Sequence, residues 1–298
     1  MKLLAVVSAT AMDLEDNLPE RVRSALSRNS DADVGLLVSG SRDEIAAAVD
    51  SAASEGVDRV VAVGGDGTVS AVAAALVGGD IPLAIVPLGS GNVLAETLGI
   101  PSKRDGAIEM AREGASVRSI DAMRVDGRFA FLNAGIGVSS LTVRDVPHEA
   151  KRVFGRLAYL VTGIGKAVSA GPAEFRVAID GTERTLQAIE VSVVNAALTK
   201  ERPVFLFPGI RPDDGALDVL VVWAPSVPGF LRKAAEATLG WTELERNVQW
   251  SLARSTIVVD ANPELPVQAD GDIVGTTPVT IEVVRGALGV VTPPGRSW

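Results

Sequence analysis

The chain has 298 residues, of which 47% are hydrophobic and 22% are charged, a globular composition with enough length for two domains. Its formal net charge of −9 argues against a general nucleic-acid binder, whose surface is basic. The absence of cysteine excludes disulfides and thiolate metal sites, and a lone histidine, His148, excludes a multi-histidine zinc site. We interpret His148 as a solvated structural residue.

The N-terminus begins with a short apolar run over residues 3–7 that an acidic stretch soon follows. We interpret this run as a buried strand rather than a signal peptide, because no longer apolar segment or clear cleavage site precedes the acidic residues. No apolar run elsewhere approaches the ~18–20 residues that a membrane-spanning helix needs. We therefore expect a cytoplasmic protein.

The first ~120 residues alternate between apolar runs and helical patterns, as a doubly wound, Rossmann-like α/β sheet requires. Ser41 is a plausible N-cap for the second helix, because its hydroxyl can accept a backbone hydrogen bond there. The expected strands cover 3–7, 34–38, 60–63 and 83–86. The expected helices cover 18–27, 42–54 and 68–76, and a last one ends at Leu98.

Two glycine-rich turns follow the third and fourth of these strands. The first reads Gly64-Gly65-Asp66-Gly67-Thr68, and the second reads Pro87-Leu88-Gly89-Ser90-Gly91-Asn92. Glycines let a backbone approach a ligand closely, and a helix N-terminus directly behind them favours phosphate. A carboxylate in the first turn makes chemical sense if it holds a cation, or a water on a cation, that neutralises the phosphate. Because carboxyl ends of parallel strands meet at one crevice, the sequence predicts nucleotide-dependent phosphoryl chemistry there.

The chain after about Ile120 reads as mainly β, with Asp-Gly turn signals between short strands, as in a sandwich-like domain. One segment, 154–168, has the pattern of a basic amphipathic helix. It can lie on a membrane surface, or it can cover a sheet with a solvated basic face. The expected strands are 128–132, 174–179, 189–194, 217–223, 255–260 and 280–284.

The order of motifs over nearly the whole chain resembles the diacylglycerol kinase catalytic-domain superfamily, which includes bacterial lipid kinases, sphingosine kinases and ceramide kinases. Beyond the two glycine turns, the motifs are Asp214-Gly215-Ala216-Leu217-Asp218 and Asp270-Gly271-Asp272. The resemblance implies a nucleotide-binding domain over 1–122 and a β-rich, lipid-binding and catalytic domain over 123–285. It also implies that residues 286–298 return to the first domain.

The resemblance implies an ATP- and Mg²⁺-dependent lipid kinase of phospholipid metabolism, attached peripherally to a membrane. It would transfer the γ-phosphate to the hydroxyl of diacylglycerol or a related lipid. Asp214 and Asp218 match a metal-binding motif, and Asp66, Asp270 and Asp272 would be catalytic. The implied nucleotide-binding residues are Gly64, Gly65, Asp66, Gly67, Thr68, Gly89, Ser90, Gly91 and Asn92.

The chemistry of Asp270-Gly271-Asp272 is consistent with this role, since two carboxylates across a glycine can converge on one site from a tight turn. We take Asp272 as the base that accepts the proton of the substrate hydroxyl. The alternative is a plain hairpin turn, for which Asp-Gly is a common signal.

Three departures from the family pattern keep other interpretations open. Residues 8–12, Ser-Ala-Thr-Ala-Met, replace an Asn-Pro-x-Ser/Ala-Gly element, Val93 replaces a frequent aspartate, and Asp272 replaces the usual glutamate. One alternative is a catalytically weak or inactive relative that binds nucleotide or lipid. Another is an NAD kinase-like enzyme, which shares the first glycine turn but not the second. The acceptor lipid and a homodimer through sheet edges also remain open.

Overall fold

The computed structural model describes residues 1–14, 17–28, 32–114, 116–145, 171–197, 209–223 and 248–295. The chain divides into two compact units, one of residues 1–121 with 286–298 and one of residues 122–285. His148 and the basic helix expected over 154–168 lie outside the described residues.

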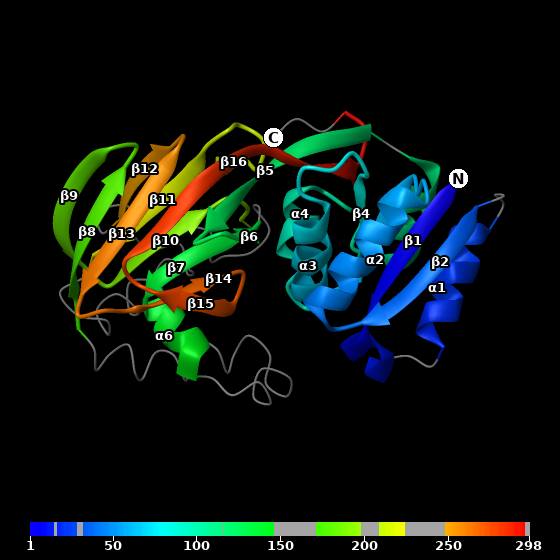
Figure 1. The fold of residues 1–298 in the computed structure, drawn as a ribbon, viewed down its shortest axis with the longest axis horizontal. Coiled ribbons are helices and arrows are strands. Elements are labelled where there is room, and N and C mark those ends of the chain that lie inside the picture. The colour runs from blue at the N-terminus through cyan, green and yellow to red at the C-terminus, as the bar shows by residue number, and fades with distance from the viewer. Residues whose placement is uncertain are drawn as a thin grey trace, which may run out of the picture. The chain divides into compact units, whose positions relative to one another are not determined.

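The first unit contains a parallel sheet with the strand order β2-β1-β3-β4 (Figure 1). The side chains of β3 are buried, as expected for a central strand with helices on both faces. The end of a long strand, β16 (Val279–Thr292), continues this sheet, with Val290 paired to Leu83 in parallel. The other strands are β1 (Lys2–Ser8), β2 (Asp33–Ser39), β3 (Arg59–Gly64) and β4 (Leu83–Pro87).

Helices cover this sheet in two groups, α1 with α5 and α2 with α3. Because the strand order reverses direction after β2, right-handed crossovers place α1 on one face and α2 and α3 on the other. The predicted doubly wound fold is thus confirmed. The helices are η1 (Ala9–Leu14), α1 (Leu18–Ser27), α2 (Arg42–Ser54), α3 (Asp66–Leu76), α4 (Val93–Thr97) and α5 (Arg104–Glu113).

The second unit contains two sheets whose inner faces share one hydrophobic core, which confirms the predicted β-sandwich. The first sheet has six antiparallel strands in the order β12-β11-β10-β7-β14-β15. These strands are β7 (Asn133–Gly137), β10 (Glu190–Val194), β11 (Leu217–Val222), β12 (Val248–Ala253), β14 (Pro266–Ala269) and β15 (Asp272–Thr276).

The second sheet of this unit pairs the start of β16 with β13, then β8 and β9. A further strand, β5, pairs with β6 and with β16. Phe175 in β8 is among the largest buried side chains of the shared core. The strands are β5 (Ser116–Val125), β6 (Arg128–Ala130), β8 (Ala173–Ile179), β9 (Thr182–Ala188) and β13 (Thr256–Asn262).

Helix α6 (Val138–Asp145) follows β7 directly and packs on β7, β14 and β15 of the six-stranded sheet (Figure 1). It therefore covers the part of the sheet next to the Asp270-Gly271 turn. Within the described part of the chain, no helix combines the length and the apolar character needed to cross a membrane.

Candidate functional site

The first glycine turn joins the buried strand β3 to helix α3. Strand β3 ends at Gly64, Gly65 is the N-cap, and α3 starts at Asp66. A Cβ atom on Gly64 would lie 2.7 Å from the hydroxyl oxygen of Thr68, so only glycine fits there without a shift. No side chain caps the start of α3, where the first turn presents its backbone N–H groups at the positive end of the helix.

The second glycine turn packs directly against the first, backbone to backbone. The N–H of Leu88 donates to the carbonyl oxygen of Gly64 at 2.8 Å. A Cβ atom on Gly89 would lie only 2.7 Å from the Cα atom of Gly65. The close approach of the two turns therefore depends on both glycines.

Two polar side chains hold these turns in place. Oδ1 of Asp66 accepts a hydrogen bond from the N–H of Val93 at 2.6 Å, which connects the start of α3 to the start of α4. Asn92 has a left-handed backbone with φ of 50°. Its side-chain amide bonds both backbone groups of Gly89, at 2.9 Å to the N–H and 2.6 Å to the carbonyl oxygen. Asp66, predicted to be catalytic, thus makes a contact that joins the two turns.

The structure brings the predicted nucleotide-binding residues together at the carboxyl ends of β3 and β4. Gly64 is buried, whereas Gly67 and Ser90 are exposed and the others are half-buried. This patch combines backbone donors, close-packed glycines and one carboxylate, a set that suits a phosphate group and its cation.

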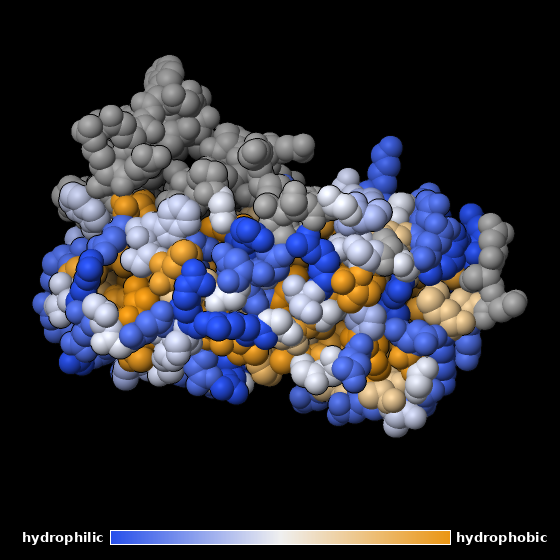
Figure 2. All heavy atoms as spheres, turned by 90° about the horizontal axis from the view of Figure 1, so that it is seen from above, coloured by the Kyte–Doolittle hydropathy of each residue, from blue (hydrophilic) through white to orange (hydrophobic). Residues whose placement is uncertain are grey.

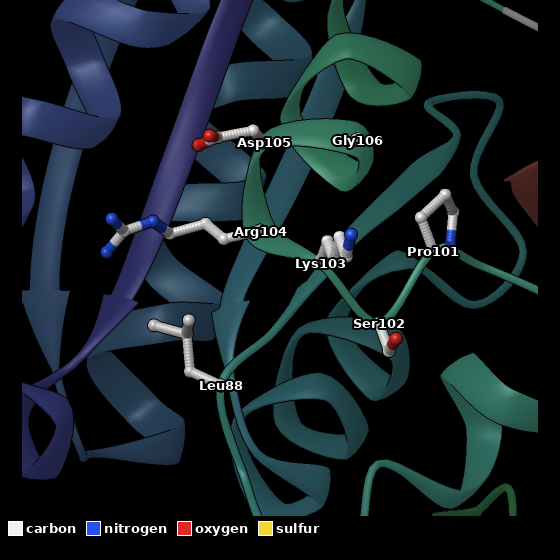
Figure 3. Close-up of a pocket in the computed structure, with 7 residues that line it drawn as sticks. All are labelled: Leu88, Pro101, Ser102, Lys103, Arg104, Asp105 and Gly106. Atoms are coloured by element: carbon white, nitrogen blue, oxygen red, sulfur yellow. The ribbon is translucent and has the colours of Figure 1, made fainter.

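A cavity of about 720 Å³ lies beside the second turn, where Leu88 forms part of its wall. Figure 3 shows Arg104 and Asp105 extending to one side of it, away from Pro101 and Ser102. The first glycine turn does not line this cavity. Its mixed apolar and charged lining was not indicated by the sequence.

In the second unit, Asp270 and Gly271 form the turn of the β14–β15 hairpin, with φ values of 49° and 88°. The carboxylate of Asp270 accepts backbone N–H groups from residues 131–133, where the chain enters β7. Oδ2 accepts from Phe131 at 2.9 Å, and Oδ1 accepts from Leu132 at 2.9 Å and from Asn133 at 3.2 Å. This engagement also explains why β6 ends at Ala130 rather than at residue 132 as expected.

Asp272 differs from Asp270 in its surroundings. It is the first residue of β15, and its side chain is exposed. Asp270-Gly271 is therefore the turn of a hairpin, and this hairpin carries an accessible carboxylate two residues after its anchor.

The two predicted metal ligands, Asp214 and Asp218, have different environments. Asp214 is exposed, and its Oδ1 accepts the N–H of Ala216 at 3.1 Å. Asp218 is 3% exposed, and its Oδ1 accepts the indole N–H of Trp250 at 2.6 Å. Burial raises the pKa of Asp218 to about 6, and the nearby charge of Asp214 acts in the same direction, while the Trp250 hydrogen bond opposes them.

These two carboxylates fit a magnesium ion only as a partial ligand set. Among the described residues, no group of three or more carboxylate or histidine side chains is arranged to hold a metal. Mg²⁺ commonly uses one or two carboxylates and keeps several waters, so Asp214 and Asp218 match its usual donor chemistry.

A buried polar cluster under α6 was not predicted from the sequence. Glu190, at the start of β10, accepts hydrogen bonds from Ser139 N–H at 2.9 Å, Ser139 Oγ at 2.6 Å and Ser192 Oγ at 2.8 Å. Burial raises the pKa of Glu190 to about 7 despite these donors. A single glutamate at a strand end has no sequence signature, so only the structure identifies it.

Comparisons with protein families cover both units. A family model described as the diacylglycerol kinase catalytic domain matches residues 3–125. A second, described as the YegS C-terminal NAD kinase beta sandwich-like domain, matches residues 133–292.

Individual relatives agree with these matches. A diacylglycerol kinase of Mycobacterium tuberculosis is 27% identical over 88% of this chain and 85% of its own length. A protein of Citrobacter koseri named "Probable lipid kinase YegS-like" is 37% identical over 41% of this chain and 42% of its own. An uncharacterized protein of Synechocystis sp. is 31% identical over 82% of this chain, which spans 57% of that relative's length.

Solved structures share the fold. A crystal structure of a diacylglycerol kinase from Bacillus anthracis has a TM-score of 0.69 at 22% identity, covering 98% of this chain and 97% of that one. A second structure from the same organism has a TM-score of 0.78 at 22% identity over the same shares. At such identity the likeness supports the architecture alone.

Proposed function

Because this chain belongs to the diacylglycerol kinase catalytic-domain family, we propose that it transfers the γ-phosphate of ATP to a hydroxyl group of diacylglycerol or a related lipid. The observation that carries the proposal is the contact between the two glycine turns, where a Cβ atom on Gly89 would lie 2.7 Å from Gly65 Cα. Such a contact has a clear use where backbone N–H groups must cradle phosphates.

The nucleotide phosphates bind at the start of α3 in this proposal. The uncapped N–H groups of the first turn donate to phosphate oxygens, aided by the positive end of the helix. Ser90 and Gly67, both exposed, lie at the rim of the same patch. Asp66 keeps the two turns in register through Val93, so its removal would disturb the cradle as well as its charge.

Asp214 and Asp218 would hold Mg²⁺, which would supply neutralisation of phosphate charge when bound. The short hydrogen bond from Trp250 fixes the orientation of Asp218. Asp214 is held by its own backbone contact to Ala216. The two carboxylates are thus oriented by this chain itself.

The reaction also needs an acceptor for the proton of the lipid hydroxyl, and we assign this role to the carboxylate of Asp272. Its exposure supports the assignment, because a substrate hydroxyl must reach within hydrogen-bond distance of the base. Asp270 supports the same turn through three backbone hydrogen bonds.

We further propose that the protein works peripherally at a membrane surface. Figure 2 shows hydrophobic side chains scattered among hydrophilic ones over the face that it presents. Large apolar side chains with more than 40% exposure include Trp223 at 49% and Leu252 at 46%. Tryptophan is favoured at membrane interfaces, where its ring is apolar and its N–H is solvated. Co-sedimentation with phosphatidylglycerol vesicles should weaken in Trp223→Ser and Leu252→Ser.

The decisive experiment is transfer of labelled γ-phosphate from ATP with Mg²⁺ to lipids in mixed micelles. The acceptors are diacylglycerol, monoacylglycerol, sphingosine, ceramide and phosphatidylglycerol, with NAD as an acceptor of another class. A labelled lipid supports the proposal and names the substrate class. Labelled NADP alone would favour an NAD kinase-like enzyme, a class that the description of the second family also names. ATP binding without any product would indicate an inactive relative.

A further inference from the structure

The backbone and the carboxylate of Asp270 hold the Asp270-Gly271 turn against residues 131–133, where the chain enters β7. Asp270 donates its N–H to the carbonyl oxygen of Asn133 at 2.9 Å. Its carboxylate accepts three N–H groups of residues 131–133 in return, at 2.9 to 3.2 Å. Both oxygens of Asp270 are therefore committed to holding the turn.

Gln268 makes a second connection across the same turn. Its side chain is 4% exposed, and both ends of the amide are hydrogen-bonded. Oε1 accepts the N–H of Gly271 at 3.0 Å, and Nε2 donates to Oδ1 of Asn133 at 3.1 Å. The orientation is unambiguous chemically, because only the amide oxygen can accept from a backbone N–H.

A second hairpin of the same unit shows which of these features is special. Asp180 and Gly181 form a turn with φ values of 47° and 84°, close to those of the Asp270 turn. The carboxylate of Asp180 also accepts three successive backbone N–H groups, those of residues 254–256, at 2.8 to 3.0 Å. An aspartate that accepts three N–H groups thus anchors both of these hairpins.

The residues on either side of the two turns differ. The position two residues before the anchor is Ala178 in one hairpin and Gln268 in the other. The position two residues after it is Thr182 in one and Asp272 in the other. The amide bridge therefore occurs at the turn that also carries the exposed carboxylate.

We propose that Gln268 is a positioning residue for Asp272: its amide fixes the Asp270–Gly271 peptide, directly before Asp272, against Asn133, while Asp270 anchors the turn and takes no part in proton transfer. This inference rests on the proposed function, in which Asp272 is the base. The N–H that Gln268 holds belongs to the residue directly before Asp272. A displacement of ~1 Å in a catalytic group can lower a rate about 10²-fold.

The test compares Gln268→Leu with Thr277→Val. Thr277 is 3% exposed, and its hydroxyl accepts the N–H of Leu265 at 3.1 Å, at the far end of the same hairpin. Gln268→Leu removes two hydrogen bonds of a buried side chain and Thr277→Val removes one, so the melting temperature of each variant is measured beside its kcat. We expect Gln268→Leu to lower kcat by about 10- to 100-fold with the KM for ATP within about twofold. Thr277→Val should leave kcat within about twofold.

A double-mutant cycle with Asp272→Asn separates positioning from a general structural role. If Gln268 acts through Asp272, then adding Gln268→Leu to Asp272→Asn lowers kcat no further. Gln268→Glu, which retains an acceptor for the N–H of Gly271, should restore part of the kcat lost in Gln268→Leu.

The outcomes distinguish this inference from the proposed function. Wild-type kcat in Gln268→Leu, or full additivity with Asp272→Asn, overturns the positioning role and leaves the lipid kinase intact. An Asp272→Asn variant as active as the wild type overturns it too, because no base is then left to position. A wild-type protein that phosphorylates no acceptor overturns both.

Discussion

Two regions of the molecule are ordered by opposite means. One is the pair of glycine turns in the first unit. The other is the acidic hairpin of the second unit, Asp270-Gly271-Asp272 between β14 and β15. At Gly65 and Gly89 the two backbones touch because side chains are missing, and a Cβ atom on Gly89 would lie 2.7 Å from Gly65 Cα. At the β14–β15 turn, the carboxylate of Asp270 and the amide of Gln268 accept backbone N–H groups. The first region therefore depends on shape, whereas the second depends on hydrogen-bond acceptors placed by the rest of the fold.

The largest effect is expected from a substitution that disrupts the contact between the two glycine turns. Gly89→Ala places a methyl group against backbone atoms of Gly65, which cannot rotate away as a side chain would. We expect ATP affinity to fall by at least about 100-fold, since a 1 Å misplacement of a binding group already has consequences of that order. Isothermal titration calorimetry with ATP in the presence of Mg²⁺ measures this affinity.

Gly35→Ala is the matched control for this change. Gly35 lies in β2 of the same unit, and its Cβ atom would come no closer than 3.6 Å to another atom, an ordinary contact. It should bind ATP like the wild type. Wild-type affinity in Gly89→Ala would contradict a cradle built on the two glycines.

The next-largest effect is expected from a substitution that removes a proton acceptor from the acidic hairpin and leaves the glycine turns intact. Asp272→Asn keeps the size of an exposed side chain but takes away a proton acceptor. General base catalysis contributes about 10²–10⁴-fold, so we expect kcat to fall by about 10²-fold or more with ATP affinity unchanged. Steady-state kinetics measures kcat, and isothermal titration calorimetry measures the affinity for ATP.

Glu264→Gln is the control, because Glu264 is an exposed carboxylate in the same unit, just before β14. Its kcat should stay within about twofold of the wild type. A fall in ATP affinity that matches the fall in kcat of Asp272→Asn would argue that Asp272 serves binding instead.

The two regions also differ in how far the sequence predicts them. The helix over 42–54 follows from its local pattern and its Ser41 cap, and the structure confirms both, with the Ser41 hydroxyl accepting the N–H of Glu44 at 3.4 Å. The glycine turns lie at the ends of strands that the apolar pattern predicts. These features depend on neighbours in the sequence, so local physics is sufficient.

The acidic hairpin is predicted only as an Asp-Gly turn, which looks the same in sequence as the Asp180 turn. Asn133 is the partner of Gln268 from 135 residues away, and no local signal indicates that pair. Strand β7 (Asn133–Gly137) is not predicted either, because asparagine and glycine disfavour strands, and its two neighbours β10 and β14 override this preference. Helix α5 is also missed, since its sequence is short and strongly polar.

A third prediction concerns another buried acceptor of the second unit, Glu190, and tests what its charge costs in stability. Burial raises the pKa of Glu190 to about 7, so the folded protein binds a proton there that the unfolded chain releases at about 4.3. The contribution of this proton to the free energy of unfolding is fully present below pH ~4, and it is lost as the pH rises through 7. Relative to a neutral side chain, the ionised Glu190 lowers the free energy of unfolding at pH 8 by roughly 3 kcal/mol.

Glu190→Gln should therefore melt at a higher temperature than the wild type at pH 8, by about 5 °C, and the gap should shrink toward pH 5. The amide still accepts from Ser139, and the hydroxyl of Ser192 can turn to accept from it. Scanning calorimetry at pH 5, 6, 7 and 8 measures the gap, with Glu264→Gln as the exposed control. A gap that is independent of pH would show that the charge of Glu190 is compensated.

The smallest effect is expected from a comparison of the two aspartates that anchor hairpins, Asp180 and Asp270. Asp180→Asn and Asp270→Asn each replace a carboxylate that accepts three N–H groups with an amide that has one acceptor oxygen. Backbone hydrogen bonds, that from Arg254 first, lower the pKa of Asp180, so its contribution to stability is present above pH ~4 and is lost in acid. We expect both variants to lower the melting temperature near neutral pH by about 2–4 °C.

Only Asp270→Asn should also lower kcat, because its turn carries Asp272, whereas the Asp180 turn carries Thr182. Equal kcat values in the two variants would mean that the Asp270 hairpin is an ordinary turn, and the difference between them measures how much of the acidic hairpin serves the reaction rather than the fold.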